Sequence, residues 1–113
     1  MDMEYRKLDP REFLFIDQFL TGVNESQKYV LQLNSAFVRD LGVKYCLRFL
    51  LYEYNYEDID VFGNNLIQKQ ILDNDNVPIL ISLDLDTKGN LFELDVWKAD
   101  FSEITINLLD ISI

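Results

Sequence analysis

The stretch that decides the fold covers residues 80–98 and reads LISLDLDTKGNLFELDVWK. Apolar and polar side chains alternate on both sides of the four residues TKGN, which is the pattern of two half-buried strands joined by a short loop. Closing a hairpin around that loop places Leu83 opposite Leu94 and Leu85 opposite Phe92, so that one face is continuously apolar. A shift of one residue would set apolar side chains against acidic ones. The sequence therefore predicts an antiparallel hairpin with a four-residue loop.

The second face of this hairpin gathers acidic side chains beside the only tryptophan of the chain: Asp84, Asp86, Glu93, Asp95 and Trp97. Like charges that face each other across strands destabilise a sheet, so we expect a basic side chain, a cation or a partner to compensate them. The candidate basic residues are Lys88, Lys98, Arg39 and Arg48. An aromatic side chain among carboxylates is typical of a protein-binding surface, because Trp is over-represented at binding hot spots. The alternative is that Trp97 only packs at the rim of the core.

The same residues approximate a calcium-binding loop, because Asp84, Asp86 and Gly89 are followed by Asp95 at nearly the EF-hand spacing. Lys88, however, puts a cation where the fifth ligand belongs, and the flanking residues alternate as strands. We therefore expect no metal ion and no other cofactor. A carboxylate-dependent hydrolase and a divalent-cation-binding module stay open as alternatives to a binding function.

The composition describes a single acidic domain over residues 1–113, with 20 acidic and 10 basic residues and a formal net charge of −10. This charge disfavours nucleic acid and attracts a basic protein. The chain has no histidine, so it lacks the usual catalytic base, and we expect no enzymatic activity. The single cysteine, Cys46, and the lack of a signal segment or a membrane-length apolar run predict a cytoplasmic protein without membrane contact.

The clearest local signal is a helix start at residues 8–13, LDPREF. Asp9 suits the N-cap, Pro10 the first helical position, and Glu12 completes a capping box. With Gly22 as a stop signal, we predict a helix over residues 10–21.

The next segment is ambiguous, because residues 29–41 fit a helix face as well as a strand. Residues 45–52 are rich in strand-forming side chains, and glycine suits the first position of a two-residue type II′ turn. We therefore favour a hairpin of residues 35–41 and 44–52 that turns at Gly42 and Val43.

The remaining elements complete the predicted sheet. Residues 66–72 predict a strand, residues 73–76 a turn, and Pro78 the start of the next strand. The tail over residues 104–113 alternates first on even and then on odd positions, which indicates a bulge or two short strands. The expected fold is α+β, an N-terminal helix packed on an antiparallel sheet of five or six strands, with the second face of the sheet partly open.

Residues 52–65 predict an ordered loop that is both acidic and aromatic. Four of its side chains extend the candidate partner-binding surface: Tyr54, Tyr56, Asp58 and Asp60. They suit recognition of a basic surface, or they pack the loop on itself. A homodimer through the apolar tail or through an exposed strand edge is a further alternative.

Residues 89–101 read GNLFELDVWKADF, and residues 38–49 run from Val-Arg-Asp-Leu to Cys-Leu-Arg-Phe. These stretches resemble a family of small, uncharacterised bacterial domains, in which a glycine turn leads into Glu-Leu-Asp-aliphatic-Trp-Lys-x-Asp-Phe. The family's glycine-rich turn before the Leu-Arg-Phe strand is reduced here to Gly42.

The resemblance implies an α+β domain of unknown activity and brings no catalytic residues with it. If the motif marks a site, its positions are Glu93, Asp95, Trp97, Lys98 and Asp100. Small acidic bacterial domains of this kind are often immunity proteins, so an inhibitor of a basic bacterial toxin is one expected form of protein binding.

Overall fold

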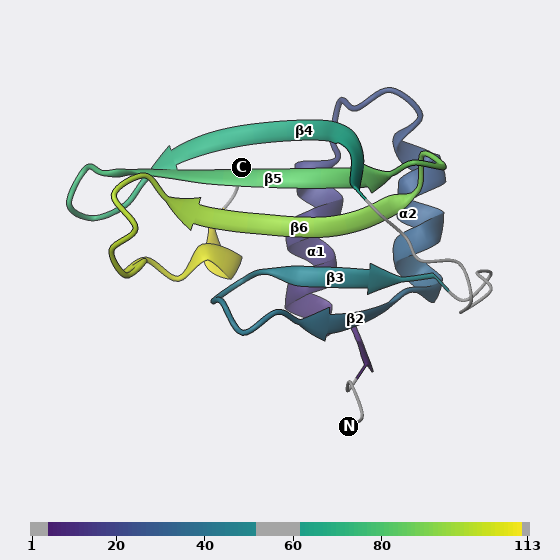
Figure 1. The fold of residues 1–113 in the computed structure, drawn as a ribbon, viewed down its shortest axis with the longest axis horizontal. Coiled ribbons are helices and arrows are strands. Elements are labelled where there is room, and N and C mark those ends of the chain that lie inside the picture. Colours follow the sequence, from purple (N-terminus) through teal and green to yellow (C-terminus); the bar gives the residue numbers. More distant parts are fainter. Residues whose placement is uncertain (1–4, 52–61, 112–113) are drawn as a thin grey trace.

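The computed structural model describes residues 5–51 and 62–111. Within these residues, six strands form one antiparallel sheet in the order β1-β2-β3-β6-β5-β4 (Figure 1). In chain order the elements are β1 (Arg6–Lys7), α1 (Pro10–Phe19), α2 (Ser26–Ser35), β2 (Phe37–Asp40), β3 (Leu47–Leu50), β4 (Phe62–Leu72), β5 (Pro78–Asp86), β6 (Leu91–Lys98) and the 3₁₀ helix η1 (Leu108–Asp110).

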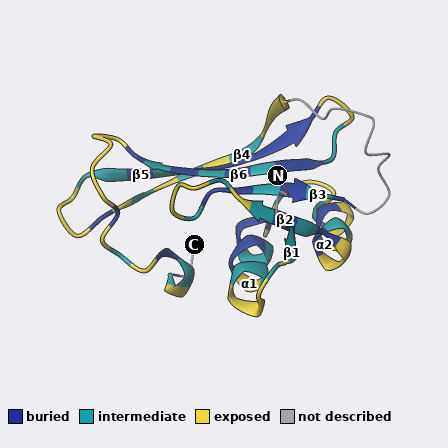
Figure 2. Ribbon diagram, turned by 60° about the horizontal axis from the view of Figure 1, so that its bottom comes forward, coloured by how far each residue is buried: buried dark blue, intermediate teal, exposed yellow. Residues whose placement is uncertain are grey.

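The molecule has two layers, with α1 and α2 side by side on one face of the sheet (Figure 2). The apolar face of the β5–β6 hairpin supplies the centre of the core, where Ile79, Ile81 and Leu83 are completely buried. Burying a side chain of this size is worth about 1.5–3 kcal/mol. The opposite face of the sheet is not covered by any helix of the described residues, and we call it the open face.

The predicted fold with a single N-terminal helix is wrong, because the described residues contain a second helix, α2, in the middle of the chain. The fold is still α+β, but α1 and α2 together cover the sheet. Tyr29 and Leu33, one helical turn apart, are buried in the core, and this burial decides an ambiguous sequence pattern in favour of the helix. The first strand of the predicted hairpin consequently starts only at Phe37.

The start of α1 is confirmed in detail. The Asp9 side chain accepts hydrogen bonds from the backbone N–H groups of Arg11 and Glu12, and the Glu12 carboxylate accepts the Asp9 N–H. The helix ends at Phe19, two residues earlier than predicted, and Gly22 lies beyond it with a φ of 86°.

The predicted two-residue turn between β2 and β3 is wrong. The strands are joined by residues 41–46, in which Gly42 and also Tyr45 have positive φ angles, 81° and 70°. This conformation lets the Tyr45 hydroxyl accept the Leu108 N–H (3.1 Å) and donate to the Ile106 carbonyl (3.3 Å). The longer connection therefore anchors the C-terminal segment.

The predicted β5–β6 register is confirmed over most of its length, with Leu83 opposite Leu94 and a loop of residues 87–90. A bulge beside the loop pairs Leu85 with Leu91, so Phe92 is the additional residue and not the partner of Leu85. The predicted turn at residues 73–76 and the strand start at Pro78 are also confirmed.

The predicted strands of the tail are wrong. Residues 99–107 contain no regular element, and η1 follows them. The alternating apolar positions do not pair as strands, because Ile104 and Leu108 are buried individually while the backbone between them is held by side chains.

The capping box gives a first testable prediction. Asp9→Ala should lower the free energy of unfolding by about 1 kcal/mol, because it leaves the first N–H groups of α1 without acceptors. Urea unfolding monitored by circular dichroism measures this change. Asp17→Ala, which removes the same charge from the body of α1, is the matched control, and an equal loss in both variants would contradict the capping role.

Candidate functional site

A polar row crosses the open face on five adjacent strands. Cross-strand pairing places its members next to one another in the order Arg39, Arg48, Glu93, Asp84 and Asn65. Two cations from β2 and β3 thus lie beside two carboxylates from β6 and β5. The predicted opposition of Asp84 and Glu93 is confirmed.

Arg48 compensates Glu93, as the sequence suggested. Its guanidinium donates to the Glu93 carboxylate (3.2 Å) and lies 4.2 Å from the ring centre of Phe92. Both charged side chains are partly shielded from water, with 30% and 22% of their surface exposed. Part of the predicted acidic surface is therefore neutralised within the sheet.

Asp84 is compensated by neutral donors. It is buried, and its Oδ1 accepts hydrogen bonds from the Ser82 hydroxyl (2.8 Å) and the Asn65 side-chain amide (2.9 Å). The Asn65 amide also approaches the Ser82 hydroxyl at 2.6 Å. These bonds tie the carboxylate to its own sheet.

Asp86 shapes the hairpin loop. It is 2% exposed, and its Oδ1 accepts the backbone N–H groups of Lys88 (2.8 Å) and Asn90 (3.0 Å). Its Oδ2 is buried and accepts no hydrogen bond from the described residues. Across residues 5–51 and 62–111, no group of three or more Asp, Glu, His or Cys side chains could hold a metal ion.

Asp95 and Trp97 follow Glu93 on the same face of β6. The half-buried Asp95 accepts a hydrogen bond from the Cys46 thiol (3.4 Å), whose sulfur also accepts the Val96 N–H (3.3 Å). Burial is the main cause that raises the pKa of Cys46 to about 11, so the group is a neutral thiol. β3 pairs with β6 only at Leu94 and Glu93, and the Cys46 sulfur contacts the next two residues of β6, Asp95 and Val96.

The half-buried Trp97 lies on an open groove of about 250 Å³, which we call the Trp97 groove. Val43 and Lys44 from the β2–β3 connection line it together with residues 101–104. Phe101 is 86% exposed and Val43 62% exposed. This is an exposed aromatic and apolar surface at one end of the sheet.

Lys98, also predicted as a binding residue, points to the other side. It pairs with the core residue Ile79, and its side chain is 1% exposed. Its ammonium contacts the carboxylates of the completely buried Asp73 (2.9 Å) and of Asp75 (2.6 Å), and donates to the Glu103 carbonyl (3.2 Å).

Asp73 is the centre of this cluster, and sequence reasoning saw it only as a turn residue. It accepts the backbone N–H groups of Asn74, Thr105 and Ile106 and the Thr105 hydroxyl, at 2.7–3.1 Å. The β4–β5 turn, the end of β6 and the C-terminal segment therefore meet at one carboxylate. We call Asp73, Asp75, Lys98 and Thr105 the Asp73 cluster.

The cluster changes the acidity of its members. Burial alone would raise the pKa of Asp73, but hydrogen bonds from Thr105, Lys98 and Asn74 outweigh it and hold this pKa well below its usual range. The hydrogen bond from Lys98 lowers the pKa of Asp75, and the same bond is the main cause that raises the pKa of Lys98.

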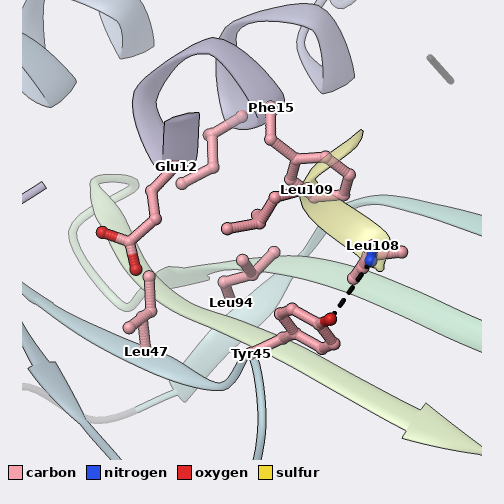
Figure 3. A pocket seen from close by; sticks show the side chains of 8 residues that line it. Glu12, Phe15, Tyr45, Leu47, Leu94, Leu108 and Leu109 are labelled. Atoms are coloured by element: carbon pink, nitrogen blue, oxygen red, sulfur yellow. Dashed lines mark hydrogen bonds between the residues drawn. The ribbon is translucent and has the colours of Figure 1, made fainter. Parts of the chain in front are cut away.

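A small pocket beneath α1 is structural (Figure 3). Phe15, Leu94 and Leu109 line it together with Tyr45, whose hydroxyl meets the Leu108 N–H. Its volume is about 10 Å³, which is room for at most one water. It is too small for a substrate.

The remaining predicted residues, Tyr54, Tyr56, Asp58 and Asp60, lie outside the described residues. Of the predicted hairpin residues, the structure brings Asp84, Glu93, Asp95 and Trp97 together on the open face, and it separates Lys98 from them. Phe101 was missed as a surface residue, because only its place at the end of the Asp-Phe motif singled it out.

The Asp73 cluster predicts a specific pH dependence of stability. A carboxyl group whose pKa is lower in the folded state stabilises the fold above its unfolded pKa, about 3.9 for Asp, and this contribution is lost as the pH falls through the folded pKa. Asp73→Asn should therefore be less stable than wild type at neutral pH, and the difference should shrink as the pH falls from about 5 to about 2.

Urea unfolding across this pH range measures the difference. Asp17→Asn, which removes a charge from α1 away from the cluster, should stay close to wild type throughout. A difference between Asp73→Asn and wild type that does not change with pH would show that the charge of Asp73 contributes nothing.

Comparisons with known proteins identify the family to which the chain belongs. The chain matches no curated protein and no solved structure. None of the helices in the described part of the chain is long and apolar enough to cross a membrane. A family model described as "Domain of unknown function (DUF6984)" matches residues 5–108. The chain therefore belongs to the DUF6984 family, whose function is not known.

Proposed function

We propose that this domain is a non-enzymatic binding module for a basic protein, and that the partner docks at the Trp97 groove. The observation that carries the proposal is the exposure of Phe101 beside Trp97. Trp and other large aromatic side chains supply much of the binding energy at protein interfaces. Each of the two residues offers such an anchor.

The backbone at Phe101 supports this interpretation. Its φ is 61°, a left-handed conformation that is rare for a bulky side chain and costs about 1 kcal/mol. The conformation is fixed by a hydrogen bond from the Phe101 N–H to the Lys98 carbonyl (2.9 Å). Strained backbone positions cluster at functional sites, so a strained backbone that holds a phenyl ring in water supports a contact role for the ring.

The charges around the groove favour a basic partner. Asp100 and Glu103 lie close to Phe101 in the sequence and are exposed. Asp95 lies two residues before Trp97, on the same face of β6. Together with the net charge of −10, they attract a positively charged surface and orient it as it approaches. Lysine or arginine side chains of the partner would also gain from contact with the Trp97 ring.

An immunity-type inhibitor of a basic bacterial toxin is a specific form of this proposal. Small size and acidity support it by type only. The identity of the captured partner separates this form from other binding roles, since a toxin would lose activity when the domain is added in equal amount.

The proposal is tested with two variants that remove one ring each. Trp97→Ala and Phe101→Gly should each weaken binding of the partner about thirtyfold, which corresponds to the ~2 kcal/mol of a hot-spot residue. Phe101→Gly should not destabilise the fold, because glycine adopts a positive φ without strain. Loss of binding with unchanged stability would separate a contact from a structural role.

The measurement is capture from native lysate at low salt, followed by calorimetric titration with the purified partner. Leu31→Ser is the matched control, because Leu31 is an apolar residue that is 69% exposed on α2, in the helix layer. It should bind like wild type. Capture of the same protein by wild type, both groove variants and the control would contradict the assignment of the groove.

A further inference from the structure

The two edges of the sheet differ in their ability to accept another strand. β1 forms one edge and has only two residues. β4 forms the other edge and has eleven residues, and no described strand lies beyond it (Figure 1). Proteins normally protect a long edge, because its unpaired N–H and C=O groups accept a strand of another chain.

The outward backbone groups of β4 can be identified from the ladder. Asp73, directly after β4, donates its N–H to the carbonyl of Val77, directly before β5 (3.0 Å). The backbone groups of Asp73 therefore face β5. Bonding alternates along an antiparallel strand, so Ile67, Lys69 and Ile71 also face β5. The N–H and C=O groups of Gln68, Gln70 and Leu72 consequently face outward.

The usual protective devices are missing from this half of β4. The two bulges lie before Ile67, and the strand has no proline and no acidic residue. Its one charged side chain, Lys69, does not guard the edge, since its ammonium lies 5.0 Å from the ring centre of Phe19 on the helix side. Leu72 is 55% exposed.

We propose that a second copy of this chain pairs with β4, antiparallel, around a twofold axis at Gln70. Gln70 then pairs with Gln70 of the second copy, and Gln68 pairs with Leu72, so that all three outward-facing residues exchange both backbone hydrogen bonds. Centring the axis on Lys69 would set two cations opposite each other in a non-hydrogen-bonded pair, in which facing side chains lie closest together. Gln70 is therefore the self-complementary centre, and the two sheets become one.

Electrostatics distinguish this contact from the docking of a basic partner. Each copy carries a net charge of −10, so the copies repel each other, while the pairing edge itself has no acidic residue. Added salt screens the repulsion and should strengthen dimerisation. The same salt should weaken binding of a basic protein at the Trp97 groove. The two interactions can therefore fail or succeed independently.

Cysteine scanning tests the register. In a hydrogen-bonded antiparallel pair the Cα atoms are about 5.5 Å apart, which is within disulfide range. Under mild oxidation Gln70→Cys should form a disulfide-linked dimer, whereas Gln68→Cys and Leu72→Cys should each stay unlinked and should link to each other when mixed. The native Cys46 is buried and serves as the internal background.

Light scattering after size-exclusion chromatography tests the dimer without cross-linking. Wild type should show a mass that rises towards two chains with concentration and salt. Gln70→Pro should be a monomer with unchanged circular dichroism, because it removes only an outward N–H, which edge strands tolerate. A wild-type monomer at every concentration up to roughly 1 mM, or equal cross-linking of the three single-cysteine variants, would overturn the proposal.

Discussion

The buried ion pair between Asp73 and Lys98 is the contact on which the rest of the structure depends. It joins the β4–β5 turn to the end of β6, and through Thr105 and Ile106 it fixes a C-terminal segment that has no regular structure of its own. Removing charge from water is costly, so such a pair persists only where every oxygen finds a donor, as at Asp73. Because residues 101–104 line the Trp97 groove, the cluster also affects the shape of the surface to which we assign binding.

The open face illustrates how a strongly acidic chain tolerates carboxylates on adjacent strands. Glu93 pairs with Arg48 from β3. Asp84 accepts hydrogen bonds from the Ser82 hydroxyl and the Asn65 amide, so neither carboxylate requires an external ion. The unbalanced charge of the candidate site lies instead around Phe101, on exposed residues that follow the sheet. The candidate binding surface therefore lies at the end of the β5–β6 hairpin and not in its middle.

Local signals in the sequence predicted the capping box of α1, the β5–β6 register and the turn before Pro78, because each depends on neighbours in the chain or on one alternating pattern. Helix α2 was not predicted, since its pattern also fits a strand and only burial of Tyr29 and Leu33 selects the helix. The role of Asp73 was beyond sequence reasoning, because its donors come from residues about 30 positions later. The positive φ of Phe101 likewise has no signature in a sequence where glycine or asparagine would be expected.

The brevity of β1 has a consequence for assembly. A sheet with two edges that accept strands can add further chains at both ends and grow into a fibre. A sheet with only one such edge is closed once a second copy has paired with it. Two residues at the β1 margin offer too little ladder to recruit a strand. When a second copy joins β4, both outer edges of the combined sheet are β1 strands, so growth stops at two chains and no fibre forms.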